Sequence, residues 1–113
     1  MTDRQRPADR RPSVTRRLTW RTDGSEHRFH VTIGFDVVTG QPVEVFYADG
    51  QKSGTHLQHT IQDACVLISL LLQHDVLPSA ICKSLSTAPI HGQTIPATVI
   101  GVISEAVDQE VFA

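Results

Sequence analysis

The sequence predicts an α+β domain: a small antiparallel three-stranded meander packed against two to three helices, in the order β-β-β-α-α-α. Apolar and polar residues alternate strictly in FHVTIGF at residues 29–35, which is the period of a half-buried strand. After residue 55, apolar residues recur every three or four positions, which is the period of an amphipathic helix. Because the strand patterns all precede the helix patterns, segregated strands and helices are favoured over alternating β-α units.

Three short alternating runs predict the strands. They are RRLTWR at residues 16–21, FHVTIGF at 29–35 and VEVFYA at 43–48. The pair Asp23-Gly24 and the run VTGQP at 38–42 separate them, and both are typical of turns. The simplest arrangement is a meander with one apolar face.

One long helix is predicted between residues 54 and 75 and is expected to cover that face. Its apolar residues at helical spacing are Leu57, Ile61, Ala64, Cys65, Ile68, Leu71 and Leu72. Val66, Leu67 and Leu70 widen the apolar sector. We therefore expect this helix to be buried on more than one side.

Two shorter helices follow in the prediction. LPSAICKSL at 77–85 opens with Pro78 and Ser79, which are helix-start signals, whereas STAPIHGQT at 86–94 is expected to be a loop. A last helix is expected to begin at Pro96. Its apolar stripe is Val99, Ile100, Ile103, Ala106 and Val107. Glu105 and Asp108 fall outside the stripe and are interpreted as solvated surface.

The charge distribution divides the chain into a basic tail at residues 1–14 and one domain at 15–110. Residues 1–21 hold seven arginines against two aspartates, while the other 92 residues of the 113 hold ten acids against three basic residues. The tail has almost no apolar side chain to bury, so it is expected to be disordered and solubilising. The alternative is an arm for nucleic acid or an anionic partner, with Arg10, Arg11, Arg16 and Arg17 as its contacts.

We expect the protein to be cytoplasmic and to have no membrane contact. No apolar stretch follows the arginine-rich N-terminus, and the apolar run 66–72 is too short to span a bilayer. Cys65 and Cys82 are the two cysteines, and both lie in apolar patterns. They are expected to be reduced core residues rather than reactive thiols.

The junction GQKSGT at residues 50–55 is a candidate anion or nucleotide site. Lys52, Ser53, Gly54 and Thr55 precede the long helix, whose first N–H groups are free to bind phosphate. The run is not a Walker motif, because its lysine precedes the second glycine. The alternative is a strand-to-helix turn that needs glycine for backbone freedom.

Neither a metal centre nor a nucleophilic active site is predicted. His56 and His59 are weak metal candidates, because an isolated H-x-x-H without further ligands is more often an exposed polar face. The chain has no G-x-S-x-G elbow to present a serine nucleophile.

The order of segments resembles the TSCPD domain, the small domain near the C-terminus of adenosylcobalamin-dependent (class II) ribonucleotide reductases, which also occurs alone in short bacterial proteins. Three phrases carry the resemblance, which covers residues 15–110. They are Glu44, Val45 and Phe46; then Lys52, Gly54 and Thr55; then Ser69, Leu70, Leu72, Gln73 and Pro78. The motif that names the domain falls at residues 93–97, where Ile95 and Ala97 stand in its cysteine and aspartate places.

The resemblance implies a link to ribonucleoside-diphosphate reductase and deoxyribonucleotide synthesis. This chain has no room for the reductase barrel and has two cysteines, so it is not expected to be catalytic alone. Adenosylcobalamin enters by family association only, and no cofactor is expected in this chain. The expected role is an accessory module that binds a reductase large chain or a nucleotide. The alternatives are a nucleic-acid-associated protein that uses the arginine tail, and a structural homo-oligomer built on the long helix.

Overall fold

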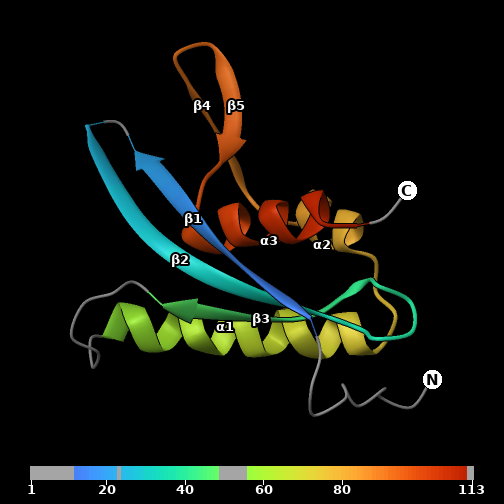
Figure 1. The fold of residues 1–113 in the computed structure, drawn as a ribbon. Helices are drawn as coiled ribbons and strands as arrows, with labels where there is room; N and C mark the ends of the chain where they lie inside the picture. Colours follow the sequence, from blue (N-terminus) through green and yellow to red (C-terminus); the bar gives the residue numbers. More distant parts are fainter. Residues whose placement is uncertain (1–11, 23, 49–55, 112–113) are drawn as a thin grey trace.

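The computed structural model describes residues 12–22, 24–48 and 56–111 and has an α+β fold (Figure 1). Its main sheet is antiparallel with the strand order β1-β2-β3. The strands are β1 (Ser13–Thr22), β2 (Ser25–Phe35) and β3 (Pro42–Ala48). The helices are α1 (His56–Gln73), α2 (Pro78–Ser84) and α3 (Val99–Gln109). The predicted fold class and the order of these six elements are confirmed.

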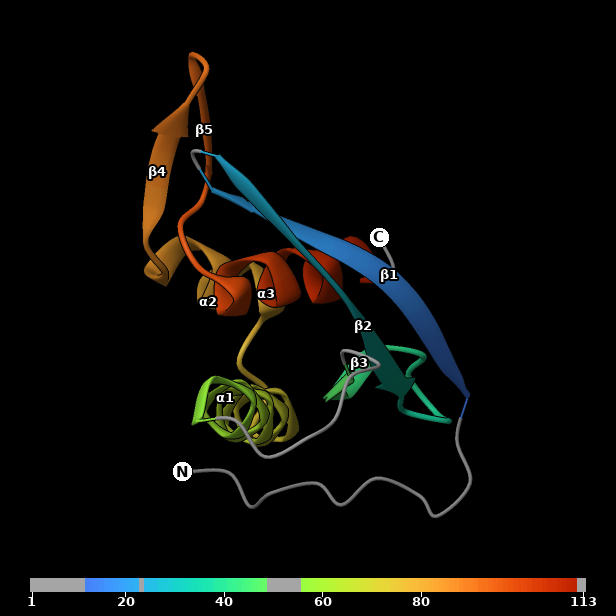
Figure 2. The same ribbon diagram turned by 90° about the vertical axis from the view of Figure 1, so that its left-hand side faces the viewer.

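Two of the described helices pack on one face of the sheet, α1 against β3 and α3 against β1, and α2 packs on α3 (Figure 2). The inner face of the sheet carries Phe29, Val31 and Ile33 of β2, all of which are almost completely buried. These side chains meet the buried residues of the two helices, which are Ile61, Cys65, Ile68, Leu72, Val99, Ile103, Ala106 and Val107. The apolar stripe predicted for α3 therefore lies in the core, with Ile100 partly buried beside it.

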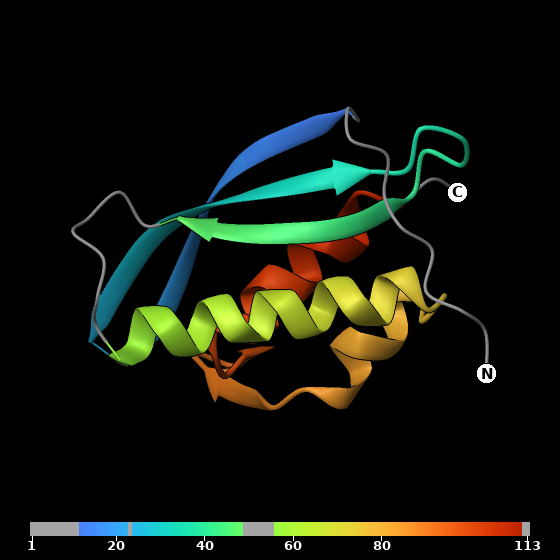
Figure 3. The same cartoon turned by 90° about the horizontal axis from the view of Figure 1, so that it is seen from below.

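Helix α1 runs alongside the edge strand β3, and its polar side chains bond the backbone groups of that edge (Figure 3). Gln62 donates from Nε2 to the Tyr47 carbonyl at 2.9 Å and accepts from the Tyr47 N–H at 3.3 Å. Ser69 Oγ accepts from the Val45 N–H at 3.0 Å. Gln73 Nε2 donates to the Val43 carbonyl at 3.0 Å.

These contacts close an edge that would otherwise offer unpaired N–H and C=O groups to another strand. Alternate residues of a strand turn their backbone groups to the same side, which is why residues 43, 45 and 47 are the ones bonded. Gln62, Ser69 and Gln73 lie seven and four positions apart, so they share one side of α1. We name these three residues the edge clamp.

The prediction that residues 86–94 form a loop is wrong. The segment forms a hairpin of β4 (Thr87–Ile90) and β5 (Gln93–Pro96). Its two turn residues, His91 and Gly92, have φ of 50° and 79°, which fits the left-handed turn that suits the twist of a two-residue hairpin. Pro96 therefore ends β5 rather than beginning a helix. The last helix starts at Val99, where the Thr98 hydroxyl accepts from the Gly101 N–H at 3.0 Å.

Candidate functional site

The predicted anion site at Lys52, Ser53, Gly54 and Thr55 lies outside the described residues, as do Arg10 and Arg11 of the tail. The long helix is confirmed as α1, which is described from His56, while its start predicted near Gly54 and Thr55 lies outside the described residues. The anion-binding role of the junction stays a prediction.

The two histidines proposed as weak metal candidates lie on the first turn of α1. His56 and His59 are both exposed. Within the described ranges, no group of three or more histidine, cysteine or acidic side chains is placed to hold a metal ion. A site made of two exposed imidazoles alone lacks the four ligands that structural zinc takes.

Arg16 and Arg17, which were predicted as part of a binding arm, both lie in β1 and point to opposite faces of the sheet. Arg16 faces inward and donates to the Ala106 carbonyl at 3.1 Å and to Gln109 Oε1 at 2.9 Å. Its guanidinium also lies 3.6 Å from Glu110 Oε1. A cation here satisfies free carbonyls at the C-terminus of α3 and complements the helix dipole. Arg17 is exposed on the outer face.

The cysteines are free, and their surroundings disfavour thiolate. Cys65 is buried in the core, and burial raises its pKa to about 12. Burial also raises the pKa of Cys82, and the negative charges of Asp108 and Glu105 add to that effect. Because the thiolate is the reactive form of cysteine, neither residue is suited to nucleophilic or redox chemistry at neutral pH.

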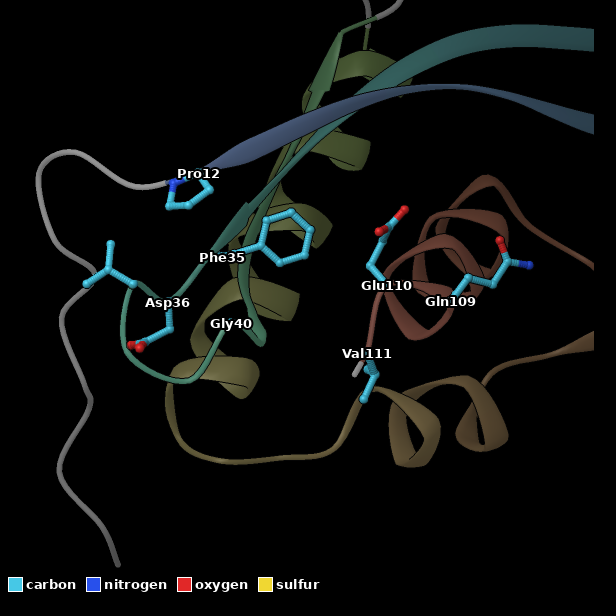
Figure 4. A pocket seen from close by; sticks show the side chains of 8 residues that line it. Pro12, Phe35, Asp36, Gly40, Gln109, Glu110 and Val111 are labelled. Carbon is cyan, nitrogen blue, oxygen red and sulfur yellow. The ribbon is translucent and has the colours of Figure 1, made fainter. Parts of the chain in front are cut away.

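An open cleft of about 490 Å³ lies between Pro12, the β2–β3 turn and the end of α3 (Figure 4). It adjoins a second cavity of about 480 Å³, and Asp36 and Val111 line both. The polar groups of the cleft are already engaged. Asp36 Oδ1 accepts from the Val38 and Thr39 N–H groups at 2.8 and 2.9 Å, which lowers the pKa of this carboxyl. Glu110 faces Arg16.

The chemistry of this cleft is therefore that of a turn cap and an ion pair, not of a general acid and base. Sequence analysis did not single out Asp36 or Glu110. The only signal was the Asp-x-x-Thr spacing of a turn, which has no functional specificity.

The solvent side of α1 departs from the prediction that this helix is buried on more than one side. Leu57, Leu67 and Leu71 are 56%, 61% and 42% exposed, and Val66 is exposed as well. With 3.6 residues per turn, these three leucines and the half-buried Ala64 form one stripe, opposite the edge clamp. We name Leu57, Ala64, Leu67 and Leu71 the α1 stripe. Contiguous exposed apolar residues of this kind mark surfaces that bind other proteins.

The described residues thus place together neither a nucleophile with a base nor a metal ligand set, and they present instead an apolar helix surface. These features define a small α+β domain. The model of the TSCPD domain family matches residues 4–110, nearly the whole chain, and the protein belongs to this family. Searches of curated proteins and of solved structures found no significant match.

The structure gives the family phrases a structural role. Ser69 and Gln73 of the third phrase belong to the edge clamp, Leu72 lies in the core, and Pro78 begins α2. The position of the naming cysteine is Ile95, in the small hairpin. The edge clamp was not predicted, although three polar residues on one side of a largely apolar helix were a usable signal in the sequence.

No helix in the described part of the chain has the length and hydropathy needed to cross a membrane.

Proposed function

We propose that the protein is an accessory module of deoxyribonucleotide synthesis, which acts in the cytoplasm by docking on the large chain of a ribonucleotide reductase. Membership in the TSCPD family supports the pathway, because this domain is otherwise found as a small part of adenosylcobalamin-dependent reductases. A stand-alone copy needs a surface through which it can associate with the catalytic chain.

The observation that carries the proposal is the α1 stripe. Three leucines about half exposed on one side of an 18-residue helix leave a large apolar area in water. The half-buried Ala64 between them allows a partner to approach the helix axis closely. An amphipathic helix that lays such anchors into a groove is a recurring mode of protein recognition.

The described residues do not point to a site for the cofactor of the reductase family. Two cavities that they line are surrounded by carboxylate, amide, threonine, proline and aliphatic groups, with one phenylalanine. Neither cavity holds a cysteine that could carry the radical generated by this cofactor in the reductases. We therefore assign adenosylcobalamin and the radical chemistry to the partner chain and derive no step through it here.

Affinity capture tests this proposal. The tagged chain is incubated with nuclease-treated native lysate, washed at two salt concentrations, and the retained proteins are identified by mass spectrometry. Recovery of a reductase large chain at both salts, lost with the double variant Leu67→Gln/Leu71→Gln, is the expected result. Val38→Gln is the matched control, because Val38 is 88% exposed but lies in the β2–β3 turn and is not part of the α1 stripe.

Self-association is the outcome that would redirect the proposal. If the purified chain is a dimer or larger species at all salt concentrations and the double variant is monomeric, the α1 stripe binds a second copy instead. If no reductase chain is recovered from the lysate, the accessory role is contradicted.

The junction before α1 supplies a second, independent prediction. If Lys52 and the N–H groups after it hold a phosphate, Lys52→Ala weakens the binding of nucleotide or inorganic phosphate while the unfolding curve stays the same. Isothermal titration with a nucleoside triphosphate measures the affinity. An unchanged affinity means that the junction is only a turn.

A further inference from the structure

None of the described helices lies over the outer face of the β1-β2-β3 sheet, and this face carries a row of arginines (Figure 2). Residues paired across antiparallel strands project to the same face of the sheet. Three successive cross-strand pairs on the outer face each contain an arginine. They are Arg17–His30, Thr19–Arg28 and Arg21–Glu26. All three arginines are exposed.

Positive charge gathers on this face although the chain as a whole carries a net charge of −2. The structure describes five lysine and arginine side chains, and three of them lie here. The five are Arg16, Arg17, Arg21, Arg28 and Lys83. Glu26 is shared by Arg21 at 3.1 Å and Arg28 at 3.4 Å, so one carboxylate faces two cations. Among the described residues, the other acid on this face is Glu44, which is buried at the far end, opposite Gly34.

An exposed aromatic ring lies on the same face of the sheet as the arginines. Phe46 of β3 pairs with Thr32 on the outer face and is 55% exposed. It lies one row from the Arg17–His30 pair, and rows on one face are about 7 Å apart. The core does not use this ring, because Phe46 points away from it between the inward-facing Val45 and Tyr47.

We propose that this outer sheet face binds single-stranded nucleic acid, with Arg17 and Arg28 holding phosphates and Phe46 stacking on a base. Cations in rows beside an exposed aromatic ring are the two elements that single-strand binding surfaces combine. An antiparallel sheet with helices on its other face and stacking aromatics on the open one is also the arrangement that RNA-recognition modules use.

The geometry favours an extended strand over a single nucleotide or a duplex. The arginines extend over three rows, so successive phosphates of one strand meet successive cations. None of the described cavities is lined by these arginines or by Phe46, so a mononucleotide would gain little burial here. A duplex keeps its bases paired and stacked, which leaves none for Phe46.

Fluorescence anisotropy with a labelled, unstructured strand of about 12 nucleotides tests the proposal on the full chain. The two phosphate contacts, at Arg17 and Arg28, predict that log affinity falls with log salt with a slope of about −1.4, since each contact contributes about −0.7. Arg17→Gln and Arg28→Gln each make the slope shallower by about 0.7. Phe46→Ala weakens binding about 5- to 100-fold at every salt concentration, with the slope unchanged.

Lys83→Gln is the control, because it removes one exposed positive charge from α2 and should leave the affinity as it is. Near-ultraviolet circular dichroism verifies that each variant is folded. The proposal is overturned if the wild-type chain does not bind, if the sheet variants bind like wild type, or if Lys83→Gln weakens binding as much as they do. If the double variant Arg10→Gln/Arg11→Gln loses binding and the sheet variants do not, the nucleic acid binds to the tail and the proposal is wrong. Equal affinity for a duplex or for inorganic triphosphate would contradict stacking on Phe46.

Discussion

Replacing Ser69 by alanine tests the edge clamp between α1 and β3. In the native fold, Ser69 Oγ accepts from the Val45 N–H at 3.0 Å and lies 2.8 Å from the Cys65 carbonyl, to which it donates. Alanine fills nearly the same volume, so no sizeable cavity forms. The substitution removes the partner of the Val45 N–H, and Val45 is only 1% exposed, so water cannot easily replace that partner.

The expected loss in the free energy of unfolding follows from two opposing effects. A buried N–H without a partner costs about 1–3 kcal/mol. Alanine is the better helix former by up to about 0.7 kcal/mol, which offsets part of that cost. We expect a net loss of about 1–2 kcal/mol, which lowers Tm by roughly 5–10 °C for a domain of this size.

Urea unfolding followed by circular dichroism measures the change, with Ser84→Ala as the matched control. Ser84 is also a helical serine that donates to the carbonyl four residues earlier, at 2.8 Å, but it is exposed and contacts no strand. The control is expected to be neutral or slightly stabilising. If both variants have the same free energy of unfolding within about 0.3 kcal/mol, Ser69 does not stabilise the edge of β3.

Three further predictions concern the packing of α3, its C-terminus and the half-buried thiol of Cys82. Gly101→Ala should destabilise the fold by about 1–3 kcal/mol despite better helix propensity, because the new Cβ would lie 2.9 Å from the proline ring that ends β5; thermal unfolding measures this. Arg16→Gln should cost about 1–2 kcal/mol through its lost bonds to the end of α3, whereas Arg17→Gln on the outer face should cost almost nothing, and equal costs contradict this role. Alkylation of Cys82 should be slow at neutral pH and accelerate as pH rises, because the pKa of this thiol is raised. Glu105→Gln removes a nearby negative charge and should speed the reaction at a fixed pH. Mass spectrometry measures the rate of alkylation.

Most of the fold was predictable because periodicity reports directly on which residues face a core. The alternating residues of β2 and the helical spacing in α1 and α3 gave the element types and their order. The β4–β5 hairpin was not predictable in the same way. Its turn is His91-Gly92 rather than the commoner Asn-Gly, and Pro89 interrupts the short first strand.

The exposure of the α1 stripe was not predictable for a different reason. A wide apolar sector shows that a helix can be buried on several sides, but not which of them the rest of the chain covers. Here a three-stranded sheet and α3 cover only the side centred on Ile61, Cys65 and Ile68. Leu67 and Leu71 remain exposed because no other element of the described part of the chain packs over them.

The candidate sites also differ in how far the sequence alone could predict them. Residue type and spacing suggested an anion site at the start of α1, yet the outer face of the sheet could be recognised only once the register placed Arg17, Arg28 and Phe46 together. Residues from three different strands share no local motif. Such surfaces depend on strand pairing, which a sequence pattern does not specify.

The most direct test of the accessory role is the affinity of the purified chain for the purified large chain of a ribonucleotide reductase from the same organism, measured by biolayer interferometry. We predict saturable binding that is weakened at least about tenfold by Leu67→Gln/Leu71→Gln and is unaffected by Val38→Gln, because buried apolar anchors carry most of the binding energy of an interface. An absence of binding, or equal binding by all three proteins, would contradict the docking surface on α1.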